Sequence, residues 1–129
     1  MQIRRYRLNA NISASANVVD TFTAQRSGTL RAVIFNILFD NITDNGTAKI
    51  MLSRAAIQDF AATGGAQTQT VAAVFQQSNF VTSGLAQPVG NFVIACNDRV
   101  STGEALYVNA LIGGTVAINC DIILVMEEA

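Results

Sequence analysis

The chain has 129 residues, of which 50% are hydrophobic and only 13% are charged, and its formal net charge is −1. This length suffices for one domain with a buried core, and the low charge argues against a protein that binds nucleic acid through a basic surface. The chain contains no histidine, which removes the commonest general base and metal ligand and so argues against an enzyme.

Uncharged polar side chains supply much of the expected surface, with 11 Asn, 8 Gln, 11 Thr and 7 Ser. A free cytosolic monomer normally carries more charge, which keeps its copies apart. We therefore expect the surface to contact other protein, either in a homo-oligomer, for which a trimer is favoured, or in a larger assembly.

The N-terminal residues 1–8 form a basic segment that contains Arg4, Arg5 and Arg7. As an arm, these guanidinium groups suit an acidic partner or a phosphate, and as an edge strand their charges protect the sheet from wrong pairing. We treat the three arginines as candidate partner-binding residues and residues 9–129 as a single β-sandwich domain. No apolar run follows the segment, so we expect no signal peptide, no membrane partner and synthesis in the cytosol.

Weak alternation over residues 9–20 predicts a first strand. The buried side of this strand would carry small or branched residues, Ile12, Ala14, Ala16 and Val18. Residues 28–39 follow with apolar side chains on both faces, which is typical of a strand buried on both sides, within the domain or at a subunit contact. Asn45-Gly46 predicts a tight turn, and residues 47–52 then return as the second strand of a hairpin.

The loop over residues 40–46 has some features of a calcium site, but Ile42 replaces an oxygen ligand and no glutamate follows at the EF-hand distance. We therefore expect no metal there and no cofactor elsewhere. Residues 53–65 give the helical signal of the chain, with Ser53 as an N-cap, one apolar face and Gly64-Gly65 at the end. A short helix in a connection between strands is the prediction.

The second half of the chain contains further short strands, including residues 90–97, separated by polar loops. Residues 100–127 predict a second hairpin, because apolar residues alternate on both sides of Gly113-Gly114. One face of the returning strand is apolar throughout, with Ile118, Cys120, Ile122, Leu124 and Met126. The other face becomes apolar near the C-terminus, so we expect a core strand that is covered on both faces there.

Cys96 and Cys120 are the two cysteines, and each lies in phase with apolar neighbours on its predicted strand. The interpretation that we favour is two buried free thiols, because free cysteine behaves as a small apolar residue and cytosolic proteins keep thiols reduced. A disulfide between Cys96 and Cys120 that bridges two strands is the alternative.

Seven or eight short strands, one helix in a connection and no alternation of strands with helices predict an all-β fold, a two-sheet antiparallel β-sandwich. A jelly roll fits this order of elements. An immunoglobulin-like sandwich is the competing architecture. It is less favoured because the chain has no tryptophan and its two cysteines lie close in sequence.

The segment Val100-Ser101-Thr102-Gly103-Glu104-Ala105-Leu106-Tyr107-Val108, followed by Gly-Gly and a long last strand, resembles the last hairpin of jelly-roll virion proteins. These are the small capsid, capsid-decoration (cement) and fibre-head domains of viruses and bacteriophages. The resemblance implies a non-enzymatic structural subunit, often a trimer, that forms a capsid or packs against other capsid proteins. Its place would be the virion, after synthesis in the host cytoplasm.

A carbohydrate- or receptor-binding module of a phage fibre or spike is the alternative function. Such sandwiches bind sugars through aromatic rings and through Asn or Asp side chains in loops. The candidates of these types are Tyr107, Asn79, Phe80, Asn91 and Asp98. The absence of tryptophan argues against this function, as does the phase of most aromatic residues, which matches core faces.

Overall fold

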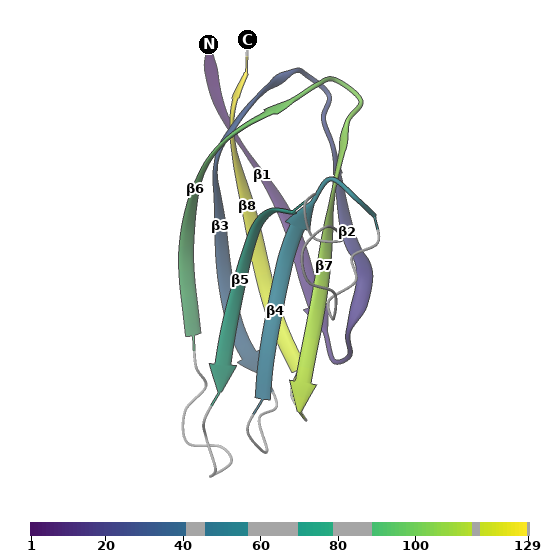
Figure 1. Cartoon of the computed structure of the whole chain (residues 1–129). Coiled ribbons are helices and arrows are strands. Elements are labelled where there is room, and N and C mark those ends of the chain that lie inside the picture. The colour runs from purple at the N-terminus through teal and green to yellow at the C-terminus, as the bar shows by residue number, and fades with distance from the viewer. Residues whose placement is uncertain (41–45, 57–69, 79–88, 115–116, 129) are drawn as a thin grey trace.

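The computed structural model describes residues 1–40, 46–56, 70–78, 89–114 and 117–128 (Figure 1). The regular structure in these residues consists of eight β-strands. In chain order they are β1 (Gln2–Ile12), β2 (Ala16–Thr23), β3 (Gly28–Asp40), β4 (Gly46–Ser53), β5 (Thr70–Ser78), β6 (Val89–Val100), β7 (Ala105–Gly114) and β8 (Ala117–Glu128). Strand β1 crosses the boundary expected at residue 8.

The strands form two antiparallel sheets of four. The first sheet has the order β1-β8-β3-β6 and the second has the order β2-β7-β4-β5. One hydrophobic cluster contains residues from both sheets, so the sheets pack face to face as the two layers seen in Figure 1. The predicted all-β, two-sheet antiparallel sandwich is confirmed.

Both predicted hairpins are wrong, because β3 and β4 lie in different sheets and so do β7 and β8. Alternation on each side of a turn identifies two strands, but it does not determine whether the second strand returns beside the first or crosses to the facing sheet. The two segments pair with each other instead, β3 with β8 and β4 with β7. Most of the Asn45-Gly46 turn and of the calcium-like loop, residues 41–45, lies outside the described residues.

The core faces of the central strands follow the expected period of two. Phe35 is fully buried at the middle of β3, together with Val33 and Ile37. The inner face of β8 carries the predicted residues, Ile118, Cys120, Ile122, Leu124 and Met126. Leu30 also reaches the core, although it is out of phase with Val33, because a bulge between Leu30 and Ala32 shifts the register of β3.

The single strand predicted over residues 9–20 is wrong. β1 ends at Ile12, and the chain bends before β2 begins at Ala16 in the other sheet. Ala14 and Val18, which were expected on the buried side, are exposed. β2 is irregular after Ala16, and Val18 has a φ of 56°. Valine rarely adopts this left-handed backbone, so the bulge breaks the period on which the prediction relied.

The helix predicted over residues 53–65 falls mostly outside the described residues. Ser53, the expected N-cap, is the buried last residue of β4, and residues 54–56 are not helical. The remainder, from residue 57 onward, is not described. Within the described ranges, no helix has the length and apolar character needed to cross a membrane.

Candidate interaction surface

The outer face of the first sheet carries apolar side chains that the sandwich does not bury. We call the six central ones the outer patch: Ala32, Ile34, Val93, Ala95, Ile123 and Val125. Val93 is 64% exposed, and Ile34 and Ile123 are half-buried. The interpretation that both faces of β3 and of the end of β8 are buried within the domain is therefore wrong, whereas burial of β3 at a subunit contact stays a prediction.

The strand register places the residues of the outer patch in two adjacent rows. Ile34 of β3 faces Ile123 of β8 on one side and Val93 of β6 on the other. Ala32 faces Val125 and Ala95 in the same way. Because directly paired residues in an antiparallel sheet share a face, the six side chains form one continuous apolar surface.

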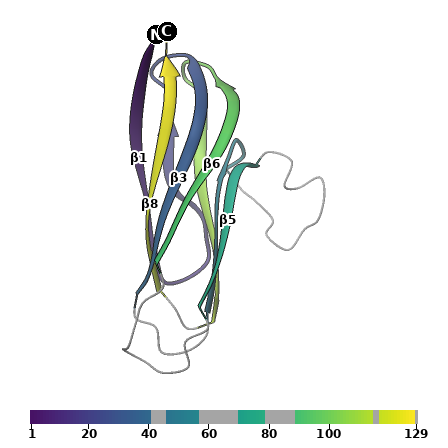
Figure 2. The same ribbon diagram turned by 90° about the vertical axis from the view of Figure 1, so that its left-hand side faces the viewer.

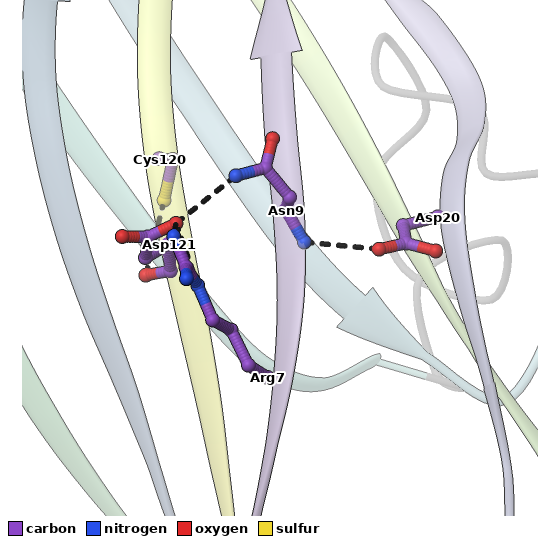
Figure 3. A network of polar contacts seen from close by, with 5 residues as sticks. All are labelled: Arg7, Asn9, Asp20, Cys120 and Asp121. Atoms are coloured by element: carbon purple, nitrogen blue, oxygen red, sulfur yellow. Dashed lines mark hydrogen bonds and ion pairs between the residues drawn. The ribbon is translucent and has the colours of Figure 1, made fainter.

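Paired charges border the outer patch on the same face. Asp121 Oδ1 accepts hydrogen bonds from Arg7 Nη2 at 2.7 Å and from Asn9 Nδ2 at 3.0 Å, as Figure 3 shows. Beyond the other end of the patch, Arg31 Nε donates to Glu127 Oε2 at 2.8 Å. An apolar centre with charges confined to its rim is the usual anatomy of a protein–protein interface. The outer patch is therefore the candidate site for a protein partner.

The three candidate arginines of the N-terminal segment do not form one site. Arg4 has its Nε 3.4 Å from Glu128 Oε1, and Arg7 is paired with Asp121. Arg5 is exposed and faces Val125 across the β1-β8 ladder. Its side chain has no hydrogen bond or ion pair with the residues that the structure describes. Of the three, Arg5 is the guanidinium that can contact a partner from the border of the outer patch.

Glu128 and Tyr6 form a polar contact at one end of the first sheet. Glu128 is only 2% exposed, and its Oε2 accepts a hydrogen bond from the Tyr6 hydroxyl. This hydrogen bond and burial raise the pKa of Tyr6. Arg4 lies beside the same carboxylate, so its charge offsets the burial of Glu128 and helps to hold β1 against β8.

The segment over residues 100–108 begins at the same end of the sandwich, because Val100 and Glu128 both pair with Gly28. Glu104 accepts a hydrogen bond from Ser101 N at 3.0 Å and another from Arg54 at the end of β4. Both contacts lower the pKa of Glu104, and the hydrogen bond from the Ser101 backbone has the larger effect. Gly103 N donates to Ala24 O at 2.8 Å, which ties the segment to the chain after β2. These residues have a structural role in the described part of the chain.

The two cysteines are free thiols and do not bridge strands of one chain. Strand β3 separates β6 from β8, and Cys120 faces Ile37 whereas Cys96 lies opposite the bulge at Arg31. Their Cα atoms are thus roughly 20 Å apart, at about 3.3 Å per residue and about 4.8 Å per strand. A disulfide requires a separation below about 7 Å.

We expect Cys96 to react with iodoacetamide before Cys120 in the native chain at mildly alkaline pH. Cys120 is buried, and burial is the main cause that raises the pKa of its thiol to about 12. Burial and Asp98 also raise the pKa of Cys96, but this thiol is partly exposed on an outer strand. Mass spectrometry of peptides after brief labelling measures both rates. Labelling in urea is the control, and equal rates in the native chain would contradict the assignment.

The residues proposed for sugar binding are not brought together in the described part of the chain. Tyr107 lies on β7 in the second sheet, whereas Asn91 and Asp98 lie on β6 in the first. Asn79 and Phe80 are outside the described residues. Among the residues described, no three Cys, Asp or Glu side chains are grouped so that they could hold a metal ion.

Sequence analysis identified part of the outer patch but not its extent. Apolar residues in both phases of β3 and at the end of β8 are the signal, and for β3 the sequence leaves open whether they are buried within the domain or at a subunit contact. Val93 and Ala95 give no such signal, because Asn91 and Asn97 lie in the same phase of the strand, and a mixed phase is typical of a face that meets solvent. No protein-family model matches the chain, and comparison with curated proteins finds no similar sequence.

Proposed function

We propose that this protein is a non-enzymatic structural subunit that self-associates and forms or decorates the capsid of a virus, in particular a bacteriophage. The observation that carries the proposal is the outer patch, a continuous apolar surface on a domain with few charges. A subunit of a permanent assembly can retain such a surface because its partners cover it, whereas a free monomer rarely exposes one.

The sandwich is a jelly roll in this proposal. Support comes from the nested pairing of its strands, in which β1 pairs with β8, β2 with β7, β3 with β6 and β4 with β5. This is the order obtained when one long antiparallel hairpin of four strand pairs is rolled into two sheets. In this proposal, the connectivity corresponds to the jelly-roll architecture that capsid and lectin domains share.

The proposed partners are other copies of the chain and other capsid proteins. The proposed location is the virion, after synthesis in the host cytoplasm. A non-enzymatic role is supported by a sequence without histidine and by carboxylates used as structural contacts, such as Asp121 with Arg7 and Glu104 with Arg54. Sugar or receptor binding lacks comparable support, because its described candidates lie in different sheets.

Density-gradient centrifugation of particles from the source of the gene tests the proposal. We expect peptides of this chain to band with the major capsid protein at a constant ratio across the particle fractions. Purified chain added to particles that lack it should then sediment with them. A chain that stays at the top of the gradient in both experiments would contradict a role in the virion.

A further inference from the structure

Strand β6 ends the first sheet, and its residues 90–97 carry no charge. In the described part of the chain, β6 pairs with β3 alone. Among the described residues, no strand pairs with the other side of β6, so its backbone N–H and C=O groups there are available to another strand. The lysines, arginines and prolines that protect such edges in monomeric proteins are absent from residues 90–97.

The inner side chains of β6 are also incompletely covered. Phe92, Ile94 and Cys96 pack against the core, but each remains partly exposed. On β1, at the opposite edge of the same sheet, the central inner residues Leu8 and Ala10 are buried, and only Tyr6 and Ile12 of its apolar inner residues are partly exposed. A strand added beyond β6 would remove the remaining apolar surface of its inner residues from water.

The other outer strands of the sandwich do not combine an uncharged edge with incompletely covered apolar residues. β1 carries three arginines, and β2 is interrupted by the bulge at Val18, two devices that hinder pairing with another chain. β5 lies next to β6 on the same side of the molecule (Figure 2), but its inner residues Ala72 and Val74 are already buried. An uncharged edge with incompletely covered apolar residues is thus found on β6.

We propose that β6 pairs in antiparallel orientation with β6 of a second copy, so that two first sheets join into one sheet of eight strands. The inference rests on the proposed self-association and names the surface that produces it. Antiparallel pairing of identical strands about a two-fold axis is self-complementary, because the same backbone groups serve both chains. It produces a dimer, whereas the trimer expected from the sequence requires a different, heterologous contact.

The charges at one end of β6 favour this orientation. With Val93 opposite Val93 of the second copy at the axis, residues 90–96 of the two chains face each other in reverse order, and no charge enters the paired segment. The two Arg99 residues then lie roughly 41 Å apart, at about 3.4 Å per residue. Parallel pairing in register would bring them within about 5 Å, where like charges repel each other.

Pairing through β6 also joins the two outer patches. Val93 and Ala95 belong both to β6 and to the outer patch, so they would adjoin the same residues of the second copy. The dimer would present one apolar surface that runs across both chains and is bordered by the ion pairs described above. Such a surface suits attachment to a larger protein shell.

Substitution of Val93 and of Ile3 by lysine tests the proposal in the full chain. These residues are matched, since both are exposed branched side chains on outer strands of the same sheet, at 64% and 60%. Sedimentation velocity should find the wild type at twice the chain mass of 13.7 kDa. Val93→Lys should weaken this dimer by about tenfold or more, because two lysines then lie close to the axis. Ile3→Lys should leave it unchanged.

Circular dichroism should show the wild-type fold in both variants. A dimer that persists in Val93→Lys would overturn the β6 contact but not the proposed self-association. A wild type that is a trimer would have the same consequence. A monomeric wild type would overturn both. Alkylation of Cys96 gives a second readout, because the added strand should slow the reaction in the wild type relative to Val93→Lys. Equal alkylation rates would overturn the contact.

Discussion

Replacement of Phe35 by alanine is expected to lower the free energy of unfolding by about 3–5 kcal/mol. Phe35 is fully buried at the centre of β3, where it faces Ile122 of β8 and Phe92 of β6. Alanine at this position leaves a cavity between the sheets that the surrounding strands cannot fill without moving. Because typical domains are stable by only about 5–15 kcal/mol, this loss is a large part of the total.

Ile34→Ala is the control for the Phe35 prediction. Ile34 is the preceding residue, but it lies half-buried on the outer face, so its truncation should cost about 1 kcal/mol. Urea unfolding followed by circular dichroism measures both variants. The chain concentration must be constant, because association makes apparent stability depend on it. Equal losses at the two positions would contradict the assignment of the inner and outer faces of β3.

Gly28→Ala is expected to destabilise the fold by about 2–3 kcal/mol through steric overlap. A Cβ atom on Gly28 would lie 2.6 Å from the backbone oxygen of Glu127, which is closer than real contacts allow. Gly28 is paired with both neighbouring strands, facing Glu128 of β8 and Val100 of β6. Since the obstacle is backbone, rotation of a side chain cannot relieve it, and the strands have to separate.

Gly103 provides the comparison for Gly28, because it is required for a different reason. Its φ is 86°, and a Cβ atom there would meet nothing within 4 Å. Alanine should cost about 1–2 kcal/mol for the left-handed backbone. Asparagine should cost less, since it tolerates that backbone. At Gly28, asparagine should be at least as harmful as alanine. Thermal unfolding of the alanine and asparagine variants at both glycines measures these losses of stability. If asparagine were milder than alanine at Gly28 as well as at Gly103, the steric explanation for Gly28 would be contradicted.

The inner faces of the strands were predictable where one phase is clearly more apolar than the other. β8 is the best example, because its outer phase contains Asn119 and Asp121 while its inner phase is apolar from Ile118 to Met126. β5 shows the limit of this reasoning. Both phases of its first half are apolar, and the inner residues are Ala72 and Val74. Which of the two phases faces the core depends on the facing sheet, and the local sequence pattern carries no information about that sheet.

The pairing of the strands was not predictable from local patterns. Turn signals are local, whereas every ladder in the described residues joins strands that belong to different halves of the chain. Bulges at Arg31 and Val18 also escaped prediction, because a bulge arises from two strands that accommodate each other. The correct class, an antiparallel sandwich, followed from the number and spacing of the strands alone.

The candidate site was predictable in its composition but not in its geometry. The arginines were identified from their clustering in sequence, yet alternation along β1 directs Arg4 and Arg5 to opposite faces. The carboxylates that neutralise Arg4 and Arg7, Glu128 and Asp121, lie more than a hundred residues away in the chain. Which guanidinium remains available therefore became clear from the register of β1 with β8.

The nested pairing of the strands determines when the nascent protein can fold. Each ladder takes one strand from β1 to β4 and the other from β5 to β8, so the first four strands leave the ribosome without any of their final partners. Folding through such distant contacts is slow and leaves apolar strands accessible for longer. The first sheet is complete only after translation of β8. The risk of aggregation is therefore highest between the emergence of β3 from the ribosome and the release of the chain.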